Sequence, residues 1–353
     1  MTRTKQKVAI LGATGAVGQT FIRLLAGNPW FEISELLASE RSAGQRYRDV
    51  VKWHEGTLPP EVGELTLLPA DPAHVSSMIA FSAMDSSVAG PIEKAFAQAG
   101  KTVLSNSKNH RMDADVPLVI PEINADHMRL LEHQRAVRGW SGAIVTNANC
   151  SATVAAMALA PLHERFGINQ LFISTMQAIS GAGYPGVPSA DILGNVIPYI
   201  ADEEAKIEVE LGKILGELEG NAITNAAFTV SAHTNRVPVE HGHTVCMSVG
   251  LDGSPDVKAI RAALDEWTGA PEVRSLPGGK HRPLVVRDEP DRPQPRRDVN
   301  TGEGMTVVVD RVREDAILDV RLVAMGHNTV RGAAGGSILN AELLLSTGAI
   351  PSA

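Results

Sequence analysis

The stretch Lys7-Val-Ala-Ile-Leu-Gly-Ala-Thr-Gly-Ala-Val-Gly18 decides the fold of the first half of the chain. Residues 7–11 are apolar after Lys7 and predict a buried strand, and glycines follow at 12, 15 and 18. Glycines let a backbone approach a pyrophosphate, and a helix starting here presents free N–H groups to it. The position of this motif after the first strand therefore predicts a dinucleotide-binding turn. The candidate cofactor contacts are Gly12, Thr14, Gly15, Ala16 and Val17.

Outward from this turn, the first 150 residues alternate short apolar runs with amphipathic stretches. Further strands are expected at 33–38, 78–83, 101–104 and 143–146, and helices at 20–26 and 90–99. Strands alternating with helices predict a parallel sheet covered on both faces.

The pattern changes after residue 150. An apolar helix is expected over 151–160, with Pro161 ending or kinking it. Longer strands are expected at 171–178, 228–236, 244–251, 305–312 and 317–325, and helices at 202–215, 256–268 and 329–346. Residues 276–304, rich in Pro, Gly and charge, predict an ordered or partly mobile loop. This half is therefore expected to be α+β, with a mixed or antiparallel sheet.

Composition excludes several classes of function. The 353 residues carry a formal net charge of −8 and only 4% aromatic residues, which argues against nucleic acid and anionic membranes as partners. No apolar run approaches the roughly 18 residues that span a bilayer, and residues 1–7 contain no signal-type apolar core. With two cysteines, Cys150 and Cys246, neither a disulfide framework nor a cysteine-rich zinc site is expected. A cytoplasmic protein with free thiols is predicted.

Residues 39–44, Ser-Glu-Arg-Ser-Ala-Gly, follow the expected second strand. A site for NAD usually places a carboxylate here, and Glu40 is the candidate. Arg41 between Ser39 and Ser42 suits a 2′-phosphate better, because a guanidinium pairs well with phosphate oxygens. A solvated polar loop is the alternative, and the residues favour NADP over NAD.

Asn147-Ala-Asn-Cys-Ser151 places a thiol at a strand end and at the start of the apolar helix. The helix dipole and nearby N–H groups favour the thiolate, which is the nucleophilic form. Cys246 lies instead in an apolar strand pattern and is expected only to fill space. We therefore predict that Cys150 is a nucleophile, with a small buried hydrophobe as the alternative.

Three histidines, His233, His241 and His243, surround Arg236. A cysteine nucleophile needs a proton donor and acceptor with a pKa near neutrality, which histidine supplies. His241 and His243 alternate around Gly242, so both are expected on one side of a strand, and the residues alone do not choose among the three. No metal is expected, because no further cysteine or His/Asp spacing supports a metal site.

Glu203 and Lys206 are three residues apart on an expected helix and share one face of it. Taken alone, they predict an exposed ion pair that contributes little to stability. Only the rest of the pattern gives them a function.

Together these segments resemble the aspartate-β-semialdehyde dehydrogenase family, specifically its archaeal/fungal-type branch. The likeness covers nearly the whole chain and rests on the joint order and spacing of segments that are individually weak. The segments are GATGAVG (12–18), LLASERSAGQ (36–45), SNSKNHRMDADVPLVIPEIN (105–124), NANCSA (147–152), QAISGAGYPG (177–186), DEEAKIEVE (202–210), NRVPVEHGHT (235–244), EPDRPQPRRD (289–298) and GHNTVRGAAGG (326–336).

The resemblance implies a reaction of lysine, threonine and methionine biosynthesis, in which NADPH reduces β-aspartyl phosphate to aspartate semialdehyde and phosphate is released. It implies Cys150 as the nucleophile that forms a thioester, His243 as the acid/base and Gln177 as a residue that positions the thioacyl group. The implied substrate contacts are Arg236 for the carboxylate, Glu203 for the amine, Lys206 and Arg111 for phosphate, and Asn149. The resemblance also implies cofactor contacts at Ser180, Gly181 and Asn328.

For the organisation of the chain, the resemblance implies a Rossmann-like NADP-binding domain over residues 1–149 together with a C-terminal helix at 328–353. A catalytic and dimerisation domain is expected over residues 150–327. The family is usually a homodimer or homotetramer, paired through this second domain.

Enzymes of the same build remain alternatives, namely malonyl-CoA reductase, which resembles the same branch, and N-acetyl-glutamyl-phosphate reductase. The amino group of aspartyl phosphate needs a carboxylate such as Glu203, whereas an acetylated amine or a coenzyme A substrate does not. Two further classes are a redox sensor that binds NADP without catalysis and a structural dimerisation module. The complete set of Cys150, Lys206, Arg236 and His243 argues against a loss of chemistry.

Overall fold

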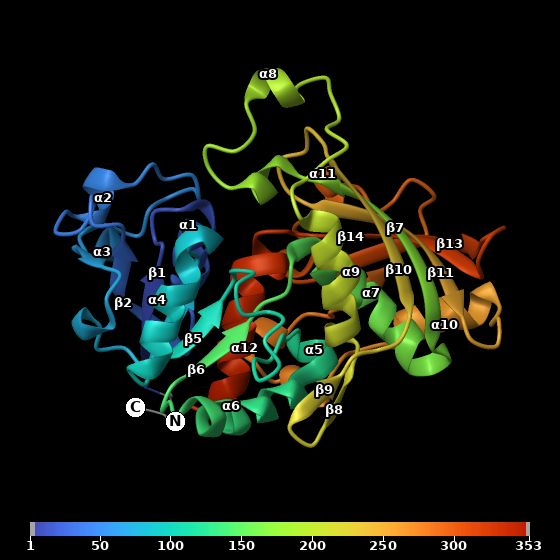
Figure 1. The fold of residues 1–353 in the computed structure, drawn as a ribbon. Helices are drawn as coiled ribbons and strands as arrows, with labels where there is room; N and C mark the ends of the chain where they lie inside the picture. Colours follow the sequence, from blue (N-terminus) through green and yellow to red (C-terminus); the bar gives the residue numbers. More distant parts are fainter. Residues whose placement is uncertain (1–3, 351–353) are drawn as a thin grey trace.

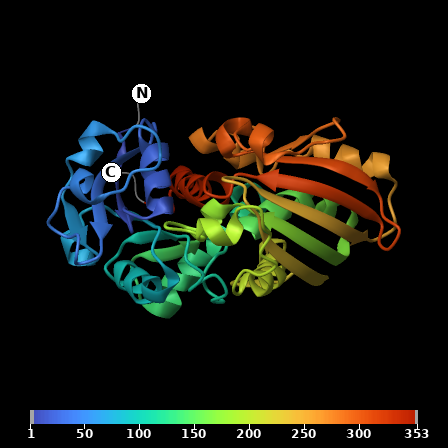
Figure 2. The same ribbon diagram turned by 90° about the horizontal axis from the view of Figure 1, so that it is seen from above.

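The computed structural model describes residues 4–350. The expectations for residues 1–3 and 351–353, which include the chain start and the end of the C-terminal segment, lie outside the described residues. Two six-stranded sheets stand side by side, one in each half of the molecule (Figure 1). Figure 2 shows from above that the C-terminal helix lies between the two halves.

The first sheet is parallel throughout and has the strand order β3-β2-β1-β4-β5-β6. Its strands are β1 (Gln6–Leu11), β2 (Phe31–Ala38), β3 (Leu67–Pro69), β4 (Ile79–Ser82), β5 (Thr102–Ser105) and β6 (Ala143–Thr146). The order reverses between β1 and β4, and ligands of such sheets bind in the crevice at the carboxyl ends of the strands there. The expected Rossmann-like architecture of this half is confirmed.

Helices cover both faces of the first sheet. The longer ones are α1 (Ala16–Leu25), α4 (Ser86–Gln98), α6 (Leu130–Arg138) and α12 (Gly335–Ser346). Short helices are α2 (Tyr47–Val50), α3 (Pro60–Gly63) and α5 (Pro121–Asn124). The C-terminal α12 returns to this sheet, where its Ile338 and Leu343 share one apolar core with Phe21 and Phe81.

The second sheet is mixed and has the strand order β10-β7-β11-β14-β13-β12. Its strands are β7 (Ile168–Gln177), β10 (Thr229–Arg236), β11 (His243–Leu251), β12 (Leu284–Val286), β13 (Val307–Glu314) and β14 (Val320–Gly326). The outer pairs β10–β7 and β12–β13 are parallel, and the three inner pairs are antiparallel. The mixed sheet expected for this half is thus present.

One face of the second sheet packs against three helices, α7 (Cys150–Phe166), α9 (Glu203–Ile214) and α10 (Val257–Glu266). A separate hairpin is formed by β8 (Glu217–Glu219) and β9 (Ala222–Thr224). Short helices α8 (Ser189–Ile192) and α11 (Pro295–Asp298) lie on connecting segments, and the segment with α8 projects from the rest of the chain (Figure 1).

Two expectations about this half were wrong. Of the two outcomes expected at Pro161, an end of the helix is contradicted: α7 runs on to Phe166, because residues 151–162 are buried and their packing outweighs one missing hydrogen bond. Residues 276–304 do not form only a loop, since Leu284 starts a strand that pairs with Val307 in β13. Three residues are too few to show a periodic pattern, so only the partner strand reveals β12.

Candidate active site

Cys150 is the first residue of α7, which begins at the carboxyl end of the first sheet. Asn149 precedes it as the N-cap, and its Oδ1 accepts hydrogen bonds from the backbone N–H groups of Ser151 and Ala152 at 3.0 and 3.1 Å. Such a cap satisfies helix N–H groups that have no partner inside the helix. The predicted thiol position at a helix start is present, and the cap holds the thiol in place.

The Sγ atom of Cys150 lies 3.1 Å from Nε2 of His243, the first residue of β11. The backbone N–H of Ala178 donates to Nδ1 of the same ring at 3.1 Å. Since Nδ1 accepts, the neutral imidazole carries its proton on Nε2, on the side of the sulfur. Among the three histidines, the structure therefore brings His243 to the thiol.

The other two histidines point elsewhere, so the expected alternation of His241 and His243 on one strand was wrong. Gly242 has a φ of +100° and stands before the strand, which turns the His241 ring to Ser180 Oγ at 3.1 Å. His233 lies on β10 and its ring contacts Phe172 at a centroid distance of 5.5 Å.

Burial raises the pKa of the Cys150 thiol to about 12, the carboxylate of Glu203 raises it too, and Arg111 and Arg236 oppose this. Burial also lowers the pKa of His243 to about 3, and the charge of Arg236 adds to that effect. The expectation that the helix start favours the thiolate is therefore outweighed by desolvation. At rest the pair consists of a neutral thiol and a neutral imidazole.

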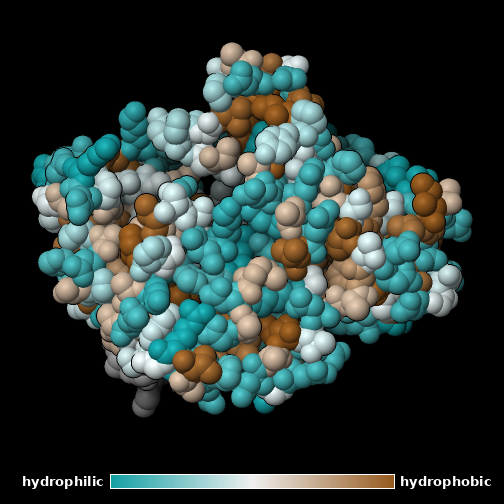
Figure 3. Space-filling view, viewed as in Figure 1, coloured by the Kyte–Doolittle hydropathy of each residue, from teal (hydrophilic) through white to brown (hydrophobic). Residues whose placement is uncertain are grey.

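A cavity of about 400 Å³ opens over the thiol. Figure 3 shows mostly hydrophilic residues over the hollow between the two halves, where this cavity lies. Its lining includes the candidate side chains Arg111, Asn149, Cys150, Gln177, Glu203, Lys206 and Arg236. Residues that are far apart in the sequence thus meet in one polar cavity.

Glu203 and Lys206 belong to this cavity and not to an exposed helix face. The Glu203 side chain is buried, and its Oε1 accepts from Asn149 Nδ2 at 2.8 Å. Its Oε2 accepts from Lys206 Nζ at 3.2 Å. The reading as a purely exposed ion pair was therefore wrong for Glu203, because tertiary packing turns this face of α9 inward.

Two further candidates lie at strand ends. Arg236, the last residue of β10, is buried and donates from Nη1 to the carbonyl oxygen of Ala178 at 2.8 Å. Gln177, the last residue of β7, is buried and donates to Thr175 Oγ1 at 3.3 Å. The same backbone residue, Ala178, thus contacts both Arg236 and His243 and fixes their relative position.

The sequence pointed to Glu210 only as a second carboxylate in the helix of Glu203 and gave it no role, yet it is 1% exposed at the same site. Its Oε1 accepts from Arg111 Nη1 at 2.9 Å, and its Oε2 accepts from the backbone N–H of Asn149 at 2.6 Å. The signal for this residue was present, since positions 203 and 210 are two helical turns apart and share one face. Gly332 was missed, and a Cβ there would lie 2.7 Å from Cys150 Cβ.

The glycine-rich turn fits a dinucleotide. A Cβ at Gly12 would lie 2.8 Å from the carbonyl oxygen of Ala83, and one at Gly18 would lie 2.3 Å from that of Gly12, so these two serve packing. A Cβ at Gly15 would meet only the Gly12 carbonyl oxygen, at an ordinary contact distance of 3.5 Å, and α1 starts after Gly15 without a side-chain cap. The first N–H groups of α1, next to Thr14 and Ala16, therefore remain for a pyrophosphate. Val17 lines the Cys150 cavity.

The loop after β2 places Arg41 on the surface, and its guanidinium has no ion-pair partner among residues 4–350. The backbone N–H of Ser42 donates to Ser39 O at 2.9 Å, which folds the two hydroxyl residues around Arg41. From the second half, Asn328 Nδ2 donates to Ser180 Oγ at 2.8 Å, beside Gly181. The candidate cofactor contacts thus lie along the first turn, the second strand end and the cavity wall.

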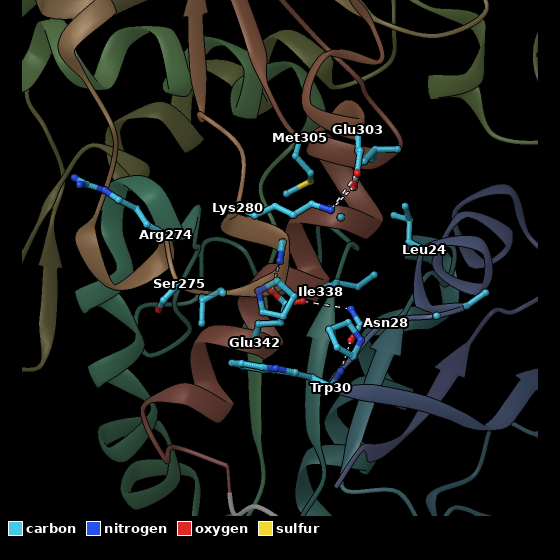
Figure 4. A pocket seen from close by; sticks show the side chains of 18 residues that line it. Leu24, Asn28, Trp30, Arg274, Ser275, Lys280, Glu303, Met305, Ile338 and Glu342 are labelled. Atoms are coloured by element: carbon cyan, nitrogen blue, oxygen red, sulfur yellow. Dashed lines mark hydrogen bonds and ion pairs between the residues drawn. The ribbon is translucent and has the colours of Figure 1, made fainter. Parts of the chain in front are cut away.

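A larger cavity of about 570 Å³ lies elsewhere, between the end of α1, residues 274–280 and α12 (Figure 4). The carboxylate of Glu342 accepts hydrogen bonds from Gly278 N at 2.7 Å and Asn28 Nδ2 at 3.3 Å, and Lys280 pairs with Glu303. Because Glu342 is 0% exposed, its carboxylate joins these segments and is closed to a ligand. None of the candidate catalytic side chains lines this cavity.

Within residues 4–350, no helix combines the length and apolarity needed to cross a membrane. In the same part of the chain, no group of three or more His, Cys, Asp or Glu side chains is arranged to hold a metal ion.

Family models match both halves of the chain. The NAD binding domain of semialdehyde dehydrogenase matches residues 7–131, and the dimerisation domain of semialdehyde dehydrogenase matches residues 159–331. The chain therefore belongs to the semialdehyde dehydrogenase family.

Relatives define the branch of this family. Aspartate-semialdehyde dehydrogenase of Archaeoglobus fulgidus is 46% identical, over 97% of this chain and 98% of the relative. The crystal structure of aspartate semialdehyde dehydrogenase with NADP from Candida albicans superposes with a TM-score of 0.90, at 41% identity over 98% of this chain and 100% of that one. Malonyl CoA reductase (NADP) of Metallosphaera sedula is 39% identical over 99% of both chains. The resemblance to the archaeal and fungal aspartate-semialdehyde dehydrogenases is thus confirmed.

Proposed function

We propose that the chain is an NADP-dependent aspartate-semialdehyde dehydrogenase that reduces β-aspartyl phosphate to aspartate semialdehyde in lysine, threonine and methionine biosynthesis. The observation that supports this best is the Cys150–His243 pair at 3.1 Å, in a cavity that also carries Arg111, Lys206 and Arg236. A thiol, a proton donor and three cations are what an acyl phosphate with a free carboxylate requires.

In the first step, Sγ of Cys150 attacks the carbonyl carbon of the acyl phosphate. A C–S bond forms, the bond from carbon to the phosphate oxygen breaks, and phosphate leaves with the electron pair and takes up the proton that the Cys150 thiol gives up. Arg111 and Lys206 offset the negative charge that develops on the phosphate. Arg236 holds the substrate carboxylate, and Gln177 positions the resulting thioester.

NADPH, when bound, supplies the hydride that reduces the thioester. His243 donates a hydrogen bond from Nε2–H to the carbonyl oxygen and stabilises that oxygen as it becomes negative. When the C–S bond breaks, the aldehyde forms and Nε2 keeps its proton. The Cys150 thiolate that leaves takes a proton from solvent and returns to the resting thiol. The contact from Ala178 N–H to Nδ1 keeps the proton on Nε2, toward the reacting atoms.

The residues for the cofactor are Gly12, Thr14, Gly15, Ala16 and Val17 at the turn, Ser39, Arg41 and Ser42 for the 2′-phosphate, and Ser180, Gly181 and Asn328 near the thiol. We place the cofactor domain over residues 1–149 with 328–353, and the catalytic and dimerisation domain over residues 150–327. The match to a dimerisation domain fits a homo-oligomer. We assign the enzyme to the cytoplasm.

Malonyl-CoA reduction is the second candidate, because a relative at 39% identity carries that name. The buried carboxylate of Glu203 favours aspartyl phosphate. A substrate ammonium beside Glu203 cancels the negative charge that raises the pKa of Cys150, so this substrate activates the thiol as it binds. A malonyl group has no such charge.

The test follows NADPH by absorbance with aspartate semialdehyde, phosphate and NADP, beside a parallel assay with malonyl-CoA and NADPH. Phosphate-dependent formation of NADPH is expected in the first assay, with little turnover in the second. Faster oxidation of NADPH with malonyl-CoA would replace the proposal by its alternative.

A further inference from the structure

A salt bridge lies at the rim of the Cys150 cavity. Lys108 Nζ lies 2.7 Å from Asp202 Oδ2, which joins the segment after β5 to the residue before α9. The two side chains are 46% and 66% exposed. Lys108 lines the cavity, whereas Asp202 stands just outside it, next to the lining residue Glu203.

The charged neighbours of Lys108 in the cavity are held more firmly than Lys108 itself. Arg111, three residues along the same segment, is buried and fixed by Glu210 Oε1 at 2.9 Å and by Asn106 O at 2.8 Å. Its Nε is also buried and has no hydrogen-bond partner among residues 4–350. Lys206 lines the cavity from the other side. Four cations, Lys108, Arg111, Lys206 and Arg236, therefore line one cavity, and the Lys108 side chain is the most exposed of them.

Asp202 has an unusual conformation. It occupies the N-cap position of α9, where an aspartate normally accepts a helix N–H, yet its side chain makes no such bond. Its φ is 60°, in the left-handed region that aspartate and asparagine tolerate better than most residues. The helix α9 therefore has no side-chain cap from Asp202, and the Asp202 carboxylate contacts Lys108 instead. This arrangement indicates that the position of the Lys108 ammonium matters.

We propose that Lys108 is a third phosphate ligand, beside Arg111 and Lys206, and that Asp202 positions it at the rim until the phosphate displaces this carboxylate. The inference rests on the proposed function and adds a ligand to its phosphate site. An exposed ion pair is weak, so a doubly charged phosphate competes for it readily. A lysine ammonium on a flexible stem can move from one anion to the other without disturbing the backbone.

Substitutions of the two partners are then expected to change phosphate binding in opposite directions, which a merely structural salt bridge would not produce. Lys108→Met is expected to weaken binding about tenfold, because a charged hydrogen bond to phosphate is lost. Asp202→Asn keeps the left-handed backbone and removes the competing charge, so binding is expected to tighten about threefold. Binding of inorganic phosphate to the full-length protein is measured by titration calorimetry, and the KM for phosphate, the KM for NADP and kcat are measured in the assay above.

Lys94→Met, on an exposed position of α4 outside the cavity, serves as the control and should change nothing. The proposal is wrong if Lys108→Met leaves phosphate affinity within twofold of wild type. The proposal is equally wrong if Asp202→Asn weakens phosphate binding as Lys108→Met does, or if Lys108→Met raises only the KM for NADP. Calorimetry decides the question without turnover, so an absence of phosphate-dependent activity in the wild type would reject the proposed function separately.

Discussion

The two cysteines, Cys150 and Cys246, carry the same side chain in very different surroundings. Cys150 starts a buried helix, contacts His243 at 3.1 Å and faces a polar cavity. Cys246 lies in the middle of β11 between Ser174 and Val323, on the face of the second sheet opposite the packed helices. Burial raises the pKa of both thiols, so low acidity does not distinguish them. The reactivity of each thiol therefore depends on the partner groups around it.

The largest effect is expected when each thiol is removed in turn. Cys150→Ser should lower kcat by at least about 10⁴-fold, because no thioester can form, while the protein still folds. Cys246→Ser should keep most of the activity, since Cys246 is not among the residues that line the cavity. Both variants are assayed for NADPH formation with aspartate semialdehyde, phosphate and NADP. Equal losses in the two variants would remove the distinction between the cysteines.

His243→Ala is expected to make Cys150 resemble Cys246 by taking away its hydrogen-bond donor. The loss in kcat should be about 10²-fold or more, as is usual when one donor to a developing oxyanion is removed. His241→Ala is the matched control, because that ring contacts Ser180 and not the thiol. Steady-state kinetics and circular dichroism of both variants are compared. A larger loss in His241→Ala would transfer the role of hydrogen-bond donor to that residue.

Cys150 and His243 also show how much of the site could be predicted from the sequence. The position of Cys150 between a strand end and an apolar helix follows from local signals, and the structure begins α7 at Cys150, one residue before the expected start. The choice of His243 did not follow from the residues alone, because Gly242 with its positive φ breaks the strand period that would have related the two histidines. Only the resemblance to a family pointed to His243, and the structure places its ring at the sulfur.

The other features that were not predicted from the sequence have one physical cause, which is contact between segments far apart in the chain. The alternation of strands and helices predicts the first sheet well, because its elements follow one another along the chain. For the charge state of Cys150, local reasoning counts the helix N–H groups, which do lower the pKa of the thiol, but not the desolvation by distant segments, which raises it more. Glu210 and Gly332 act on residues more than 60 positions away, and such contacts exist only once α9 and the C-terminal segment are packed.

The carboxylate of Glu203 gives a smaller test of what sets the reactivity of Cys150. Because the pKa of the resting thiol is raised to about 12, its alkylation rate should rise about tenfold per pH unit from pH 6 to pH 10, without a plateau. Glu203→Gln removes a negative charge that favours the protonated form, so the pKa should fall and alkylation at pH 8 should quicken about tenfold.

The same variant should raise the KM for aspartate semialdehyde, because the substrate ammonium loses its partner. Rates at the two cysteines are separated by peptide mass spectrometry after iodoacetamide, with Glu204→Gln as the neighbouring control. Slower alkylation of Cys150 in Glu203→Gln would show that the carboxylate supports the thiolate and would reverse the sign assigned to it.

The smallest effect is expected at Cys246, where a single charge opposes burial. Arg313 on β13 lowers the pKa of this thiol, although burial raises it more. Arg313→Gln should therefore raise the pKa further and slow alkylation of Cys246 about two- to threefold at pH 8, with Cys150 unchanged. The modest size reflects solvent screening at a partly exposed face, in contrast to the buried site of Cys150. A change as large as that expected for Glu203→Gln would mean that the outer face of the sheet is as desolvated as the cavity, which would fit a partner subunit covering it.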